Sequence, residues 1–374
     1  MLLAFGHSCR YNTPAVVTRS THSTRERAWV EVDLANLVAN AQAVKSAARG
    51  ARLLPMVKAD GYGLGSAQIA LTLEQKMDPW GFGVATVQEG ADLRAAGIRR
   101  PIIVFTPALA DGFQRYREFY LQAVLDDPAV IRQWSLPYQL EIDTGMGRSG
   151  VRWNDHSLPR YRTAQLHGVF MHFHSAEHDP ASVKNQWNRF QHAVRELGQP
   201  TPMRYAANSA AIWNLNEALD LVRPGIFLYG CKPMDSAPDP APVASLLSRV
   251  VSMRTIPRGE SVSYGAEWVA PRDSRIATVG FGYADGLHRS VQGKAQVLIG
   301  GRRYPLVGRI TMDMVLADVT DARKPVEAGD VVTLVGRDGD EAITWDDLAR
   351  WAGTNTYEMM SRIGPRVERV YLNA

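Results

Sequence analysis

The feature that most constrains the fold is a repeated alternation of short apolar runs with amphipathic stretches between residues 53 and 223. The amphipathic stretches, such as SAQIALTLEQKM, have helical periodicity, and the apolar runs predict strands at 53–57, 81–85, 101–105, 122–126, 138–142, 168–173, 203–206 and 220–223. Strands that alternate with helices form parallel sheets, and eight such repeats indicate closure into a (β/α)8 TIM-type barrel. The periodicity alone also allows an open, doubly wound sheet.

A proline-rich segment, PMDSAPDPAPV at 233–243, separates this region from one with a different pattern. Its four prolines cannot continue a helix or a central strand, which marks a linker. Beyond it, segments such as RIATVGFGY and DVVTLVG are typical of short strands joined by glycine turns. We therefore predict an α/β barrel domain at 28–243 and a β-rich C-terminal domain at 244–374. Residues 1–27 are expected to form a loose N-terminal arm that can associate with the C-terminal domain.

Composition and charge exclude several classes of protein. The 42 basic and 38 acidic residues are scattered, without the long basic run that is typical of nucleic-acid binding. No segment approaches the ~20 consecutive apolar residues of a membrane span. The two cysteines, Cys9 and Cys231, are far apart, which argues against a disulfide framework or a cysteine-built zinc site. We expect a cytoplasmic protein that binds neither nucleic acid nor membrane.

Reactive side chains follow several of the predicted strands, at the end where a barrel builds its active site. They are Lys58, Arg148, His172, Asn208, Ser209 and Arg223. The loops after the seventh and eighth strands, with the sequences ANSAA and RPGI, offer hydroxyl and backbone N–H donors for a phosphate group. A lysine opposite a phosphate site in one barrel mouth indicates pyridoxal 5′-phosphate (PLP) held as a Schiff base.

The segment MVKADGYGLG, which contains Lys58, resembles the PLP-lysine signature of bacterial alanine racemases. The resemblance extends from Ala28 to Tyr371. It includes, in order, IDTGMGR, HF, ANSAA, VRPGI, SYGAEW, GYADG, GRITMDM and YEMMSRI. It implies a PLP-dependent isomerase that interconverts L- and D-alanine and so provides D-alanine.

In that family two bases act on opposite faces of the substrate, which suits a reaction that removes a proton from one face and returns it from the other. By resemblance the bases are Lys58 and Tyr264, and the family is a homodimer in which the tyrosine reaches the barrel mouth of the partner chain. His172 would bond to that tyrosine, with Arg223 behind it. Arg223 would face the pyridine nitrogen of PLP, which a guanidinium can bond but not protonate.

The resemblance also implies the binding residues. The cofactor would be held by Lys58, Tyr62, His172, Asn208, Ser209, Arg223, Gly225, Ile226 and Tyr357. The substrate would be held by Arg148, by the backbone N–H of Met312, and near Tyr283 and Asp313. The last three would come from the partner chain, as Tyr264 does.

The sequence departs from the family pattern at Glu141, where many members have a carbamylated lysine. Both groups are anionic, so we hypothesise that Glu141 orients Arg148 directly. The segments TNTYE and HFHSAEH are also unusual, and they allow a broader-specificity amino-acid racemase with a more polar entrance.

Other classes of protein remain as alternatives. His172 and His174 form an H-x-H pair that suits a metal-dependent barrel hydrolase. A PLP decarboxylase on the same barrel would normally have a late catalytic cysteine, and a non-catalytic PLP carrier would lack the second domain. The tyrosine of SYGAEW argues against both. We expect no metal.

Overall fold

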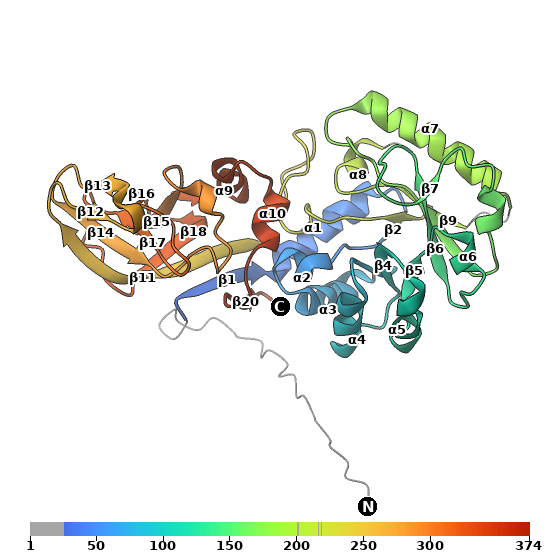
Figure 1. Cartoon of the computed structure of the whole chain (residues 1–374), viewed down its shortest axis with the longest axis horizontal. Coiled ribbons are helices and arrows are strands. Elements are labelled where there is room, and N and C mark those ends of the chain that lie inside the picture. The colour runs from blue at the N-terminus through green and yellow to red at the C-terminus, as the bar shows by residue number, and fades with distance from the viewer. Residues whose placement is uncertain (1–25, 200–201, 216, 218) are drawn as a thin grey trace, which may run out of the picture.

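The computed structural model describes residues 26–199, 202–215, 217 and 219–374. They form an elongated molecule of two lobes, a helix-covered barrel and a β-rich lobe (Figure 1). The predicted loose arm falls outside the described residues except at its last two positions, 26 and 27. Within the described part, no helix combines the length and the apolar character that a membrane span requires.

Within the described residues, eight parallel strands form the ring of the first lobe. In spatial order they are β2 (Arg52–Leu53), β10 (Leu221–Val222), β9 (Met203–Tyr205), β8 (Leu166–Phe170), β6 (Tyr138–Asp143), β5 (Gln122–Val124), β4 (Ile102–Pro107) and β3 (Phe82–Val84). A parallel bridge between Met56 and Gly83 joins the end of the β2 segment to β3 and closes the ring. The predicted barrel is therefore confirmed, and the open doubly wound sheet is not formed. A short strand, β7 (Val151–Arg152), pairs with β6 outside the ring.

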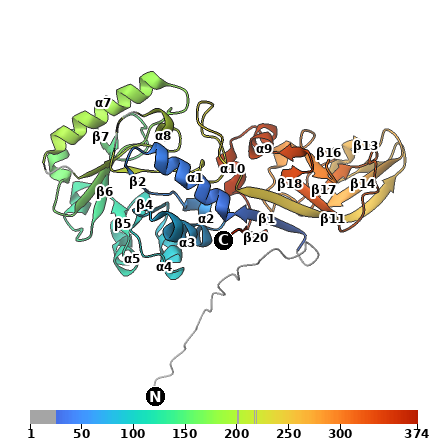
Figure 2. The ribbon, with the colours of Figure 1, turned by 180° about the vertical axis from the view of Figure 1, so that it is seen from behind.

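Helices cover the outside of the barrel, as Figure 2 shows from behind. They are α1 (Leu34–Ala47), α3 (Ser66–Met77), α4 (Val87–Ala95), α5 (Phe113–Glu118), α6 (Pro128–Ile131), α7 (Pro180–Leu197) and α8 (Ala211–Asn214). The short segment α2 (Lys58–Tyr62) lies at the barrel mouth instead. Local sequence sets their starts. The side chains of Asp33, Thr86 and Asp179 cap α1, α4 and α7 by accepting from backbone N–H groups of the first turn.

The second lobe is built on a mostly antiparallel sheet. Its strands are β1 (Ala28–Asp33), β11 (Ala244–Ile256), β14 (Ser274–Val279), β15 (Gln296–Ile299), β16 (Arg302–Val307), β17 (Val315–Asp318), β18 (Val331–Asp338), β19 (Glu341–Ile343) and β20 (Glu368–Leu372). Because β18 pairs with both β15 and β11, the central part of the sheet closes on itself. A hairpin of β12 (Ser261–Val262) and β13 (Trp268–Val269) extends from it, and α9 (Trp345–Ala352) and α10 (Thr356–Ser361) complete the lobe.

The position of strand β1 differs from the predicted domain division, which assigned residues 28–33 to the barrel domain. It pairs antiparallel with β11 and parallel with β20, so it belongs to the sheet of the second lobe. The sequence pattern WVEVDL predicts a strand but carries no information about its neighbours, because alternation depends only on burial of one face.

The lobes are joined where α10 lies against α2. One apolar core contains side chains of both lobes, including Tyr62, Trp345 and Met360. Gly63 has a φ of +82°, and a Cβ there would lie 2.2 Å from the Met360 carbonyl oxygen, so only glycine allows this approach. Arg369 of β20 donates from Nη2 to the Gly63 carbonyl at 2.9 Å. The second lobe therefore supports the turn that follows Lys58.

Candidate functional site

Lys58 lies where the first barrel segment ends and the chain turns sharply. The next residues, Ala59 to Gly63, all have left-handed φ angles between 52° and 82°. Left-handed backbone costs roughly 1–2 kcal/mol for each residue that is not glycine, so this turn needs support. Glu89, which also closes the capping box of α4, accepts from the Ala59 N–H at 2.7 Å. The side chain of Asp60 accepts from the Ser66 N–H at 2.9 Å.

Lys58 lines a cavity of about 310 Å³ at the barrel mouth. The cavity gathers every site residue that was predicted on the barrel, together with Tyr357 of α10. Its lining includes Lys58, Tyr62, Arg148, His172, Asn208, Ser209, Arg223, Gly225, Ile226 and Tyr357. The barrel residues are widely separated in sequence and meet because parallel strands all end at the same side of a barrel. Tyr357 reaches the cavity from α10 of the second lobe.

The charge of this cavity is mainly positive. Lys58 remains accessible through the mouth, yet the surrounding protein lowers its pKa, mainly by desolvation and then by the charges of Arg148 and Arg223. Glu89 opposes this shift. A lysine whose pKa is lowered has a larger share of neutral amine near neutral pH, and neutral amine is the form that attacks a carbonyl.

Arg223 is buried at the base of the cavity, at 4% exposure. Its guanidinium carbon lies 5.2–5.7 Å from the ring centres of Phe105, Phe170 and Tyr205. Burial lowers its pKa to about 10, so it keeps its proton near neutral pH. Nη2 donates to the Met171 carbonyl at 2.8 Å, whereas the buried Nη1 has no partner among the described residues. A free donor here fits a ligand with an acceptor atom, such as an unprotonated ring nitrogen.

His172 lies beside this guanidinium, with 3.2 Å between its Nδ1 and Arg223 Nη2. A guanidinium can only donate, so Nδ1 accepts and the neutral ring carries its proton on Nε2. Burial, followed by the charges of Arg223, Arg148 and Lys58, lowers the pKa of His172 to about 3. The ring is therefore neutral, and its Nε2–H is available to a further partner.

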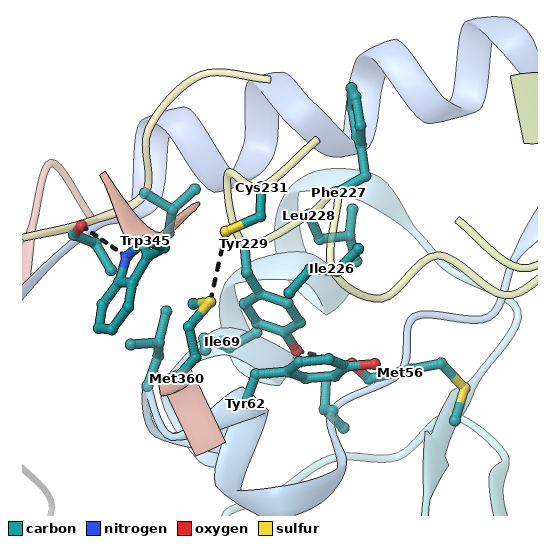
Figure 3. Packing of buried hydrophobic residues seen from close by; sticks show 14 of the residues in the cluster. Met56, Tyr62, Ile69, Ile226, Phe227, Leu228, Tyr229, Cys231, Trp345 and Met360 are labelled. Carbon is teal, nitrogen blue, oxygen red and sulfur yellow. Dashed lines mark hydrogen bonds between the residues drawn. The ribbon is translucent and has the colours of Figure 1, made fainter. Parts of the chain in front are cut away.

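Another part of the cavity lining forms a polar cradle. Ser209 Oγ accepts from the Gly225 N–H at 2.8 Å, and a Cβ on Gly225 would lie 2.4 Å from the Tyr62 hydroxyl. The Tyr62 ring stacks on Tyr229 with 4.5 Å between centroids, and Tyr229 donates to the Met56 carbonyl, as Figure 3 shows. Hydroxyl and backbone donors gathered on a small surface fit a phosphate group. Asn208 also has a structural role, because its side chain accepts from the Ala211 N–H.

The contacts of Glu141 differ from our hypothesis that this residue orients Arg148 directly. Its side chain is buried on β6 at 3% exposure and lines the cavity. Glu141 Oε2 accepts from Ser149 Oγ at 2.6 Å, and among the described residues it makes no hydrogen bond to Arg148. Glycine turns before and after Arg148 place Ser149, and not the guanidinium, against the carboxylate. The charge of Glu141 instead acts on Arg223, where it opposes in part the lowering of the pKa by burial.

Four predicted site residues do not reach this cavity. Tyr264, Tyr283, Met312 and Asp313 all lie in the second lobe, outside the cavity lining. Tyr264 is 70% exposed, Met312 is 52% exposed and Tyr283 is 40% exposed. Large apolar side chains that face solvent on one lobe are typical of an interface with another chain.

The two histidines of the H-x-H pair have different neighbours, and in the described part of the chain neither faces a group of metal ligands. His172 faces Arg223, while His174 contacts Ser175 Oγ at 2.7 Å and Ser182 Oγ at 3.1 Å. Within the described residues, no three side chains of metal-ligating type gather in one place.

The sequence did not indicate several aromatic residues that line the cavity or pack against its lining residues. The rings of Phe105, Phe170 and Tyr205 surround Arg223, and Tyr229 supports Tyr62. Phe170 and Tyr205 end their strands and Phe105 lies within β4, and such positions are common to many buried aromatic residues in a chain of this kind.

A closed parallel barrel with a lysine of lowered pKa, a free buried guanidinium donor and a polar cradle in one mouth defines a barrel enzyme fitted to hold PLP. Comparison with known proteins gives the family. Residues 32–233 match the family model "Alanine racemase, N-terminal domain", and residues 243–371 match "Alanine racemase, C-terminal domain". The chain therefore belongs to the alanine racemase family.

Individual relatives agree over nearly the whole chain. An alanine racemase of Clostridium novyi (strain NT) is 35% identical, covering 92% of this chain and 95% of its own. The structure of an alanine racemase of Clostridium difficile 630 matches with a TM-score of 0.86 at 29% identity, over 93% of this chain and 96% of the other. The structure of an alanine racemase from Bartonella henselae with covalently bound pyridoxal phosphate matches with a TM-score of 0.85 at 27% identity. The match covers 93% of this chain and 100% of the other. These relatives do not favour a metal-dependent hydrolase.

Proposed function

We propose that this chain is an isomerase that interconverts L- and D-alanine with PLP, using Lys58 of one copy and Tyr264 of a second copy. The observation that carries the proposal is the cavity itself. It brings Lys58, with its lowered pKa, together with Arg223 and the polar cradle, while the expected second base remains on the exposed surface of the other lobe.

PLP, when bound, supplies an electron sink that makes the α C–H bond of an amino acid acidic. Lys58 would hold the cofactor covalently, and Ser209, Tyr62, Tyr357 and the backbone at Gly225–Ile226 would hold its phosphate. The free Nη1 of Arg223 would bond the ring nitrogen without protonating it, because guanidinium keeps its proton. Arg148, exposed in the cavity mouth, would orient the substrate carboxylate.

The protein's own groups then move the proton. Lys58 Nζ removes or returns it on one face of the substrate, because the lowered pKa lets the amine accept a proton near neutral pH. Tyr264 Oη of the second copy serves the opposite face. His172, neutral and with Nε2–H free, would bond to that hydroxyl. Because each site would need Lys58 of one copy and Tyr264 of another, the active form would be a homodimer. We also propose a cytoplasmic location.

The first test is the circular dichroism of L-alanine incubated with the PLP-loaded protein. We expect the signal to decay to zero while D-alanine forms. A constant signal from a protein that carries PLP would contradict alanine racemisation.

The second test assigns the two bases to different copies. Lys58→Ala and Tyr264→Phe should each be inactive alone. When the two variants are mixed by unfolding and refolding, half of the dimers combine one chain of each kind, and each of these has one intact site, so about a quarter of the wild-type activity should return. If both bases came from the same chain, the mixture would stay inactive.

A further inference from the structure

Asp285 is a fully buried charged residue that the proposed mechanism does not use. Its exposure is 0%, and its carboxylate accepts hydrogen bonds from two arginines and one backbone N–H. Arg27 binds it through both terminal nitrogens, at 2.7 Å to Oδ1 and 3.0 Å to Oδ2. Arg366 binds Oδ1 from Nε at 3.1 Å and from Nη2 at 2.9 Å. The Gly282 N–H donates to Oδ2 at 2.9 Å.

The same arginines also hold Asp313. Arg27 Nη1 donates to the Asp313 carbonyl at 3.0 Å and to the Gly280 carbonyl at 2.6 Å. Arg366 Nη1 donates to Asp313 Oδ1 at 2.8 Å. Two arginines and two aspartates balance in charge, and this pairing offsets the desolvation cost of burying the Asp285 carboxylate. The cluster therefore fixes both the backbone and the side chain at position 313.

Backbone hydrogen bonds also join the loops at 280–286 and 311–314 directly to each other. The Tyr283 N–H donates to the Thr311 carbonyl at 3.1 Å, and the Ala284 N–H donates to the Met312 carbonyl at 3.0 Å. A Cβ on Gly282 would lie 2.4 Å from the Met312 carbonyl oxygen, so the two backbones are in close contact. The Met312 N–H itself bonds to no other described residue and is free for a ligand.

We propose that Arg27, Asp285 and Arg366 are positioning residues that hold the Met312 N–H and the Tyr283 ring in place for the active site of a second copy. This assignment rests on the proposed function, which gives Met312 and Tyr283 to that site. The three side chains do not line the cavity, so they act only through the loops they hold. A misplacement of about 1 Å at a substrate-binding group can cost about 100-fold in rate, so rigidity here matters.

The test compares Arg27→Ala with the wild type as PLP-loaded enzymes. Arg27 is chosen because its removal leaves Asp285 paired with Arg366, so no buried charge loses every partner. We expect the KM for L-alanine and the inhibition constant of propionate, a carboxylate that cannot racemise, both to rise about tenfold. The kcat should change less, and the fraction of PLP attached covalently should equal that of the wild type. Arg27→Lys, which keeps the charge but not the fork, should fall between the two.

Arg272→Ala is the matched control, because it removes an exposed arginine–aspartate pair, with Asp321, in the same lobe. Its KM should stay within about twofold of the wild type. An unchanged KM and propionate inhibition in Arg27→Ala, an equal effect in the control, or conversion of Arg27→Ala to monomers would overturn the assignment. If Arg27→Ala does not fold, the KM for L-alanine and the inhibition constant of propionate are measured for Arg27→Lys instead, and unchanged values overturn the assignment. A wild-type enzyme that does not racemise alanine removes the proposed function and this assignment together, whereas an active wild type with an unaffected Arg27→Ala removes only the assignment.

Discussion

Gly225→Ala is expected to weaken cofactor binding through one steric contact. The new Cβ would lie 2.4 Å from the Tyr62 hydroxyl oxygen and 3.1 Å from Tyr62 Cζ, where ordinary contacts are 3.4–4 Å. The hydroxyl must therefore move by about 1 Å, and it cannot do so freely, because the ring is stacked on Tyr229 and is only 7% exposed. The backbone itself tolerates alanine, since Gly225 does not have a left-handed φ.

The magnitude follows from the bond that is lost. If Tyr62 donates to the cofactor phosphate, its displacement removes a hydrogen bond to a charged group, worth about 1.5–3 kcal/mol. Since every 1.4 kcal/mol is tenfold in an equilibrium constant, the Kd for PLP should rise roughly 10- to 100-fold. Titration of the PLP-free protein, followed by tryptophan fluorescence, measures this constant directly.

Two further variants make the measurement decisive. Gly112→Ala is the matched control, because its φ of −87° suits alanine and its nearest neighbour would be Tyr116 Cε2 at 3.9 Å. Tyr62→Phe should weaken PLP binding by a similar factor, and adding Gly225→Ala to it should cost little more, because both changes remove the same bond. A Kd for Gly225→Ala within twofold of the wild type, or fully additive effects, would refute the reasoning.

Lys58→Ala should abolish covalent attachment of PLP, so that borohydride treatment adds no cofactor mass to the protein in a mass spectrum, whereas an added mass would place the attachment elsewhere. Glu141→Gln should lower the free energy of unfolding by about 1–3 kcal/mol, because the buried carboxylate that accepts from Ser149 Oγ at 2.6 Å is replaced by an amide; chemical denaturation should show no such loss for the exposed Glu260→Gln. Since the pKa of His172 is lowered to about 3, the unfolded chain binds a proton below about pH 6.5 that the fold does not. The wild type should therefore lose about 1–2 kcal/mol more stability than His172→Gln between pH 7.5 and pH 5, and equal losses would show that His172 titrates normally.

The barrel could be predicted because its signal is local. Apolar runs and helical periodicity depend on residues two to four positions apart, so they identify strands and helices without knowledge of distant neighbours. The rule that parallel strands end at one side of a barrel then places Lys58, Arg148, His172 and Arg223 together. The structure has all four around one cavity.

Long-range partners could not be predicted in this way. Arg27 binds Asp285 across 258 positions of sequence, and no spacing rule relates them. Glu141 could face either of two neighbouring side chains, and only the turn geometry selects Ser149 over Arg148.

The sequence by itself determined the order of strands and helices, the two-lobed organisation and the reactive side chains at the strand ends. Only the tertiary structure decided that β1 joins the second sheet, that aromatic rings surround Arg223 and that Tyr264 remains exposed outside the cavity. The physical reason is that local patterns specify which face of an element is buried, whereas the surface that buries it is chosen by the packing of the whole chain.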